Sequence, residues 1–298
     1  MIVDCHTHIW DNPDQLGEDA AAYLRRQTGR ESVSARPADH IKACDPASKT
    51  LVMGFVSEHL GASVPNEMVA RHVGAHSERL VGIAAVDPTC DGALEEANEL
   101  LDRSEFRGLT ISPATQNYHP SDSRAMKLYE LAAQRDVPVF LAHGTHFPAK
   151  GSMGYARPLL LDEIAQDYPT LTIVISGLGH PWVEEGIALV GKHERVYGDV
   201  AGLIRRPWQA YNALVLAHQF NVMDKVLFGS DFPYSTASEA IESVYRLHEV
   251  TQGTNLPSVP RETLRTMIER DALSALGIAR PGEVEAMLAE TGDDEEDV

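Results

Sequence analysis

Short apolar runs recur along the chain, and each is continuous rather than alternating with polar residues. The run at 51–56 reads Leu-Val-Met-Gly-Phe-Val, and the run at 171–175 reads Leu-Thr-Ile-Val-Ile. Continuous runs of this kind are typical of strands that are buried on both faces of a parallel sheet. Eight strands are predicted, at 1–8, 50–56, 80–88, 106–113, 137–144, 171–179, 195–202 and 225–233.

Segments with helical periodicity separate these strands. Ser121-Asp122 supplies an N-cap for the segment that ends at Arg135, and Met126, Leu128 and Leu131 fall on one apolar stripe. The other predicted helices lie at 38–43, 66–77, 92–103, 157–168, 182–193, 207–220, 236–250 and 260–276. The first crossover, 10–37, is long and polar.

The alternation of strand and helix, repeated eight times, predicts an α/β fold of the (β/α)8 TIM-barrel type. The alternative is a doubly wound open sheet, which would usually carry a glycine-rich phosphate-binding turn after its first strand, and none is present here. We expect one barrel domain over 1–280, followed by a C-terminal helix and acidic tail over 281–298.

Composition narrows the function classes. Apolar residues make up 43 % of the chain and charged residues 23 %, as in ordinary globular proteins. The formal charge of −19 argues against nucleic acid as a partner, because phosphates require basic patches. With no signal sequence and no long apolar stretch, we expect a cytoplasmic protein with no membrane partner. Cys5, Cys44 and Cys90 form no CxxC pair, and Cys5 is predicted to be a buried free thiol.

In a TIM barrel, function lies at the C-terminal ends of the strands and in the loops after them. His6 and His8 end the first predicted strand, and side chains at i and i+2 of a strand share one face. Two imidazoles on one face suit a divalent ion such as Zn²⁺. The other candidates are His143 and His146 after the fifth strand, His180 after the sixth and Asp231 after the eighth.

With these motifs, the chain resembles the amidohydrolase-related family, in the branch that includes aminocarboxymuconate semialdehyde decarboxylase and related lactonases and decarboxylases. The matching pieces are Ile-Val-Asp-Cys-His-Thr-His at 2–8, Leu-Gly-His-Pro-Trp at 178–182 and Gly-Ser-Asp-Phe-Pro-Tyr at 229–234. The resemblance implies that His6 and His8 are metal ligands and that Asp231 is a ligand and general base.

The chain also departs from the family pattern. Ala142 stands where the fifth strand commonly has a histidine, so that His143 lies one step further, and Gly177 replaces the first histidine of the sixth strand. Thr-Ile-Ser-Pro at 110–113 lacks the lysine that would be carboxylated to bridge two metals. We therefore expect a single divalent ion, Zn²⁺ or alternatively Mn²⁺.

The remaining site residues are predicted with alternatives. His143 is the candidate third nitrogen ligand, and His146 is the reserve ligand or a substrate contact. His180 is a candidate catalytic residue, or else it packs at the start of the following helix. Arg205 could clamp a substrate carboxylate, or form a surface pair with its neighbour, and Trp10 could form a wall of the substrate pocket.

These observations favour a metal-dependent hydrolase in which a water, activated by the ion and by Asp231, attacks a lactone, amide or ester of a small organic acid. The first alternative is a non-oxidative decarboxylase of an unsaturated or aromatic carboxylic acid. The second alternative is a barrel that has lost its metal and acts as a metal-free hydrolase, a binder or an inactive homologue. We expect a carboxylic acid or lactone as the small-molecule substrate. The sequence leaves the oligomeric state open, with a homodimer as one candidate, since barrels of this type often dimerise.

Overall fold

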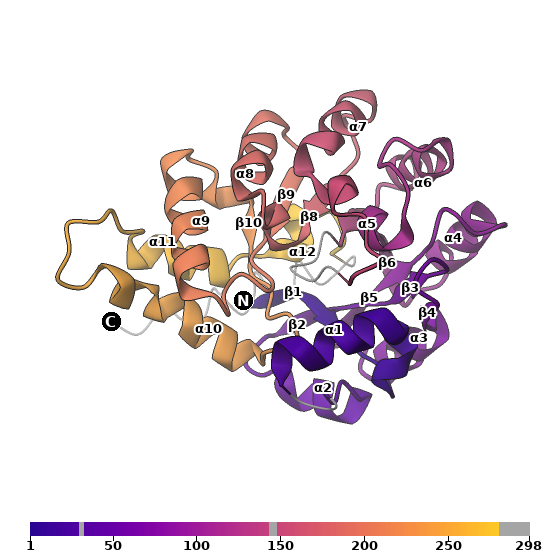
Figure 1. The fold of residues 1–298 in the computed structure, drawn as a ribbon, viewed down its shortest axis with the longest axis horizontal. Coiled ribbons are helices and arrows are strands. Elements are labelled where there is room, and N and C mark those ends of the chain that lie inside the picture. Colours follow the sequence, from indigo (N-terminus) through magenta and orange to yellow (C-terminus); the bar gives the residue numbers. More distant parts are fainter. Residues whose placement is uncertain (30–32, 143–147, 280–298) are drawn as a thin grey trace, which may run out of the picture.

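The computed structural model describes residues 1–29, 33–142 and 148–279, and within these ranges eight parallel strands form one sheet (Figure 1). In sheet order the strands are β1 (Val3–His8), β2 (Lys49–Met53), β5 (Leu80–Ala85), β6 (Phe106–Ile111), β7 (Val139–Leu141), β8 (Ile173–Ile175), β9 (Val196–Asp199) and β10 (Val226–Leu227). Each one overlaps a strand predicted from the sequence. The TIM-barrel prediction is confirmed.

Hydrogen bonds between β1 and the segment that follows β10 close the barrel. The amide of Cys5 donates to the carbonyl of Phe228 at 2.9 Å, and the amide of His8 donates to the carbonyl of Phe232 at 2.9 Å. The segment after β10 therefore runs beside β1 to its end. This closure brings the first and last predicted motifs into contact.

Helices surround the barrel (Figure 1). They are α1 (Glu18–Thr28), α2 (Pro37–Ala43), α3 (Asn66–Ala75), α4 (Ala93–Leu101), α5 (Pro113–Gln116), α6 (Ser123–Gln134), α7 (Asp162–Asp167), α8 (Val183–Lys192), α9 (Pro207–Gln219), α10 (Ala237–Tyr245), α11 (Arg261–Ile268) and α12 (Ala272–Ala275). The N-cap of α6 is Asp122, whose side chain accepts the amide of Arg124.

The structure differs from the sequence prediction in several elements. The predicted strand at 50–56 ends at Met53, and the chain then forms a two-stranded antiparallel sheet from β3 (Phe55–Ser57) and β4 (Ala62–Val64). The helix predicted at 260–276 is split, because Asp271 caps a new helix, α12, by accepting the amide of Ser274. The polar first crossover contains α1, which the sequence pattern did not predict. The tail over 281–298 lies outside the described residues.

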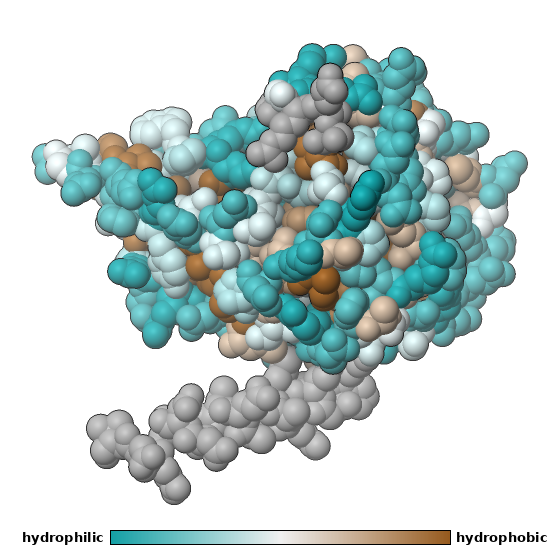
Figure 2. Space-filling model, turned by 90° about the horizontal axis from the view of Figure 1, so that it is seen from below, coloured by the Kyte–Doolittle hydropathy of each residue, from teal (hydrophilic) through white to brown (hydrophobic). Residues whose placement is uncertain are grey.

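Two apolar layers form the core. One lies between strands and helices, and the other fills the barrel, where Val3 and Cys5 of β1 join residues of β2, β5, β7, β8 and β10 and of α12. Cys5 is a fully buried free thiol, as predicted. The face shown in Figure 2 is mostly polar, with small, separate apolar patches. No helix in the described part of the chain is long and apolar enough to span a membrane.

A β-bulge interrupts β1 just before its end. Asp4 lies opposite Thr50 and Thr7 opposite Val52, so β1 takes three steps where β2 takes two. Side chains alternate along a regular strand, which would turn His6 away from the barrel interior that Cys5 occupies. The extra residue of a bulge re-aims side chains, and it lets Cys5 and His6 both face inward.

A buried histidine chain packs against the outer face of β1. The Thr7 hydroxyl donates to the Leu51 carbonyl at 2.6 Å and lies 2.9 Å from Nε2 of His40 in α2, which therefore donates to it. Nδ1 of His40 then accepts from Nε2 of His72 in α3, at 2.9 Å. Burial lowers the pKa of His40 to about 3 and that of His72 to about 4, and the positive charge of neighbouring side chains adds to the effect.

We expect the buried pair of His40 and His72 to make the stability of the fold sensitive to acid. The unfolded chain binds protons at His40 and His72 below pH 6.5, whereas the folded protein binds them only near pH 3–4, so stability is full above pH 6.5 and is lost as the pH falls. Each unit of pKa difference is worth about 1.4 kcal/mol. As the pH falls from 7 to 4.5, the free energy of unfolding in urea should decrease less in His40→Gln than in the wild type. Exposed His59→Gln is the control. Equal slopes would contradict this role.

Candidate active site

A pocket opens at the C-terminal ends of the strands, where the sequence placed the chemistry. His6, His8 and Asp231 line it together, and its empty volume is about 920 Å³, including the part open to solvent. Its apolar wall comes largely from the first crossover and the small antiparallel sheet, through Ile9, Trp10, Leu16, Tyr23, Phe55 and Val64. Trp10 thus lines the pocket, and its indole N–H donates to the Val33 carbonyl.

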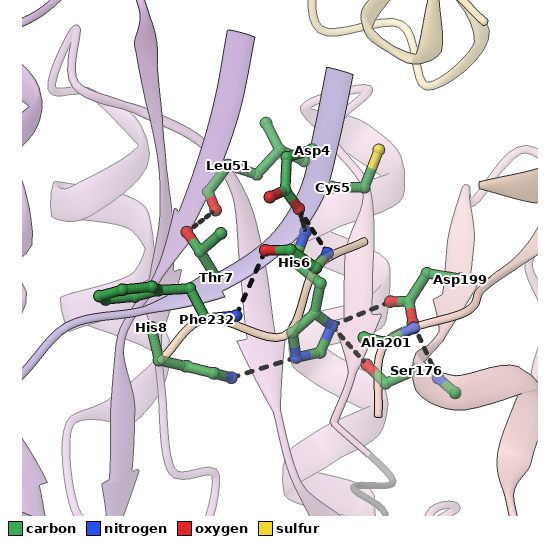
Figure 3. Close-up of polar contacts among 12 residues, drawn as sticks. Asp4, Cys5, His6, Thr7, His8, Leu51, Ser176, Asp199, Ala201 and Phe232 are labelled. Atoms are coloured by element: carbon green, nitrogen blue, oxygen red, sulfur yellow. Dashed lines mark hydrogen bonds and ion pairs between the residues drawn. The ribbon is translucent and has the colours of Figure 1, made fainter. Parts of the chain in front are cut away.

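His6 is held by a carboxylate at the end of another barrel strand (Figure 3). Its Nδ1 lies 2.9 Å from Oδ2 of Asp199, at the end of β9. Asp199 is fully buried, and its other oxygen accepts the amides of Gly177 at 2.8 Å and Ala201 at 2.9 Å. A carboxylate only accepts, so Nδ1 of His6 carries the proton and Nε2 presents a lone pair. Such carboxylate–imidazole pairs orient metal-binding histidines.

His8 is oriented in the same sense by the backbone. Its Nδ1 lies 3.3 Å from the carbonyl of Met53, which can only accept, so Nε2 of His8 also presents a lone pair. The two Nε2 atoms lie 3.1 Å apart (Figure 3). Two neutral imidazoles placed in this way have no proton to share, and they require a proton or a cation between them.

The pKa values of His6 and His8 depend on burial and on the charges beside them. Burial lowers the pKa of His6, but the Asp199 carboxylate outweighs burial and raises that pKa to about 9. Burial and the charge on His6 lower the pKa of His8 to about 3. The two pKa values therefore move in opposite directions, because only His6 has a carboxylate partner.

Asp231 approaches this centre from the loop after β10. Its backbone has φ of 62°, its amide donates to the His6 carbonyl at 3.0 Å, and its Oδ2 accepts from Arg205 at 3.0 Å. The Arg205 guanidinium also lies 4.5 Å from the ring centroid of Tyr234. Burial raises the pKa of Asp231, and the charges of Arg205 and His6 oppose that rise.

The structure does not bring all of the predicted residues together. Arg205 contacts Asp231 directly, whereas His180 is half-buried and does not line the pocket. His143 and His146 lie outside the described residues. Among the residues that the structure describes, no three His, Cys, Asp or Glu side chains come close enough to hold a metal ion. The third ligand therefore stays a prediction.

Sequence reasoning missed other residues at this site. Asp199 is an acidic residue at the C-terminal end of the seventh barrel strand, a position that could have marked it as a candidate. Tyr23 lines the pocket from α1, within a crossover that gave no signal. Ser176 lies 3.4 Å from Nδ1 of His6, through its hydroxyl.

The fold and the histidine pair define a TIM barrel with a polar centre at its C-terminal mouth. The family model described as amidohydrolase matches residues 3–265, and the chain belongs to this family, as its motifs predicted. No curated protein sequence matches the chain significantly.

Solved structures with the same fold include enzymes of several reaction classes. An uncharacterised TIM-barrel protein from Bordetella bronchiseptica is 20 % identical with a TM-score of 0.67, covering 93 % of this chain and 99 % of that one. A probable 2-pyrone-4,6-dicarboxylic acid hydrolase from Acinetobacter baumannii, with citric acid bound, is 16 % identical with a TM-score of 0.64 and the same coverage. A dihydroxybenzoic acid decarboxylase from Polaromonas, with bound manganese and 2-nitroresorcinol, is 15 % identical with a TM-score of 0.65, covering 94 % of this chain and 98 % of that one.

Proposed function

We propose that this protein is a divalent-metal-dependent hydrolase that acts on a lactone, amide or ester of a small organic acid. One observation carries the proposal: the Nε2 atoms of His6 and His8 lie 3.1 Å apart while each Nδ1 faces an acceptor. Two nitrogens bonded to one tetrahedral Zn²⁺ at 2.0–2.1 Å would lie about 3.3 Å apart. The pair therefore fits an ion, and Zn²⁺ is the expected one, with Mn²⁺ as the alternative.

The ion would be held by His6 and His8. Asp231, which the structure does not bring close enough to form a three-ligand set with them, and His143 stay the predicted further ligands. It would polarise a substrate carbonyl and lower the pKa of a water molecule. Asp231 takes the proton of the attacking water and returns it to the leaving group. Arg205, which contacts Asp231, binds a substrate carboxylate. Trp10 contributes to the apolar wall that packs against the rest of the substrate. His180 is a candidate proton donor only if it reaches the pocket when substrate is bound.

Non-oxidative decarboxylation is the second candidate, and the environment of Asp231 favours it. Burial raises the pKa of this carboxyl, which stabilises the protonated form despite Arg205 and His6. In that reaction the bond between the carboxylate and the ring or alkene carbon breaks, carbon dioxide leaves, and Asp231 delivers its proton to the carbon. The solved dihydroxybenzoic acid decarboxylase with bound manganese supports this candidate by its shared fold.

Metal binding tests the proposal directly. Protein stripped with a chelator and titrated with Zn²⁺ or Mn²⁺ should bind about one ion per chain, and His6→Ala should bind none. Exposed His59→Ala is the matched control and should bind like the wild type. A wild type that binds neither ion would contradict the proposal and favour the metal-free barrel. With metal bound, release of acid from lactones and esters, against release of carbon dioxide from aromatic acids, separates the two reactions.

A further inference from the structure

We propose that Asp4 is a positioning residue. One of its two carboxylate oxygens fixes the backbone of both segments that carry His6 and Asp231. This inference rests on the proposed function of the site. Asp4 neither lines the pocket nor contacts the imidazoles, so it acts through the residues that do.

The geometry is a single acceptor shared by two chain segments. Oδ1 of Asp4 accepts the amide of His6 at 3.3 Å and the amide of Ser230 at 2.9 Å (Figure 3 shows the carboxylate above His6). Ser230 directly precedes Asp231, whose φ of 62° turns its side chain toward the pocket. One oxygen therefore links the strand that aims a histidine to the turn that aims the acid.

The β-bulge explains why such a link is needed. An extra residue in one strand leaves part of the backbone outside the regular ladder. The amide of His6 lies in this interrupted stretch, and Asp4 supplies its acceptor. Without that acceptor, the bulge would lose the contact that holds His6 in its inward orientation.

The second oxygen of Asp4 points to a role beyond ordinary packing. Asp4 is 1 % exposed, and its Oδ2 has no hydrogen-bond partner among the residues that the structure describes. Burying an unpartnered carboxylate oxygen opposes folding. The position is thus occupied by a side chain that holds two amides at a cost to the fold.

Asp87 provides a matched comparison in the same barrel. It is also buried, and its oxygens accept the amides of Glu58 and Thr89, which lie in two separate segments. Asp87 does not line the pocket, and none of its partners is a predicted site residue. Replacing either aspartate with alanine removes a comparable set of backbone contacts, but only the Asp4 contacts lead to the histidine pair.

The experiment compares Asp4→Ala, Asp4→Asn and Asp87→Ala by two measurements. The first is the dissociation constant for Zn²⁺, which we expect to rise by about 10–100-fold in Asp4→Ala, as for other residues that support metal ligands. The second uses metal-free protein labelled with ¹⁵N-histidine, in which the Nδ1 proton of His6, bonded to Asp199, should exchange slowly in the wild type and rapidly in Asp4→Ala. Asp4→Asn keeps an acceptor oxygen and should restore both properties.

The outcomes separate a positioning role from a structural one. Two results would overturn the proposal. In the first, Asp4→Ala is no more stable than Asp87→Ala but keeps the Zn²⁺ affinity of the wild type and a slowly exchanging His6 proton. In the second, Asp4→Asn loses as much Zn²⁺ affinity and proton protection as Asp4→Ala. If Asp4→Ala does not fold, Asp4→Ser takes its place, because a hydroxyl cannot reach both amides. If the wild type binds no Zn²⁺, the proposed function fails, but the His6 proton still reports on Asp4.

Discussion

Asp231→Asn is expected to lower turnover by about 10²–10⁴-fold, the usual effect of losing a general acid or base. The carboxyl is buried, faces the pocket with the histidine pair, and is the group in either proposed reaction that moves a proton. Asparagine is nearly isosteric and tolerates the φ of 62° that this position requires. The fold should therefore survive, and the effect should appear in kcat, measured on the substrate identified by the acid-release and carbon-dioxide screens.

Asp136→Asn is the matched control for this substitution. Asp136 also has a positive φ, 49°, and also pairs with an arginine, Arg195 at 3.1 Å, but it lies on the exposed surface. Its asparagine variant should retain full turnover. If Asp231→Asn kept more than a tenth of wild-type kcat, proton transfer would have to be assigned to another group, and His180 would be the next residue to replace.

The sequence predicted the barrel because its strands are buried on both faces. Continuous apolar runs such as that at 171–175 are too short for a buried helix and too apolar for a strand with one solvated face, and their regular alternation with helices determines the topology. The pairing of the first and last motifs follows from closure, since Cys5 and His8 bond to the segment after β10. His6, His8 and Asp231 could therefore be placed in one pocket from the sequence alone.

What the sequence could not show depends on backbone detail. The HxH spacing predicts that His6 and His8 share a face, but only the bulge determines that this face is the barrel interior. Gly229 is a second example, because a Cβ there would lie 2.9 Å from Cβ of His6, so the space for that imidazole depends on a missing side chain. Neither the extra residue nor the close approach has a signature in the order of apolar and polar residues.

Asp199→Asn is expected to weaken metal binding by about 10–100-fold through the proton on His6 rather than through the fold. An asparagine oxygen can still accept the amides of Gly177 and Ala201, but its NH₂ group then faces Nδ1 of His6 and can only donate. Nδ1 must become the acceptor, so the proton moves to Nε2, into the space between the two histidines that an ion would occupy. A group that can only accept fixes an imidazole in one tautomer, as the Asp199 carboxylate does for His6 and the Met53 carbonyl does for His8.

The measurement is the Zn²⁺ dissociation constant of Asp199→Asn beside that of Asp87→Asn, together with the free energy of unfolding of both metal-free proteins. Asp87 is equally buried and accepts backbone amides but no imidazole, so its variant should lose stability without losing affinity for the ion. Unchanged affinity in Asp199→Asn would mean that His6 does not bind through Nε2. Equal loss of affinity in both variants would mean that general loosening of the barrel, and not the tautomer of His6, governs the site.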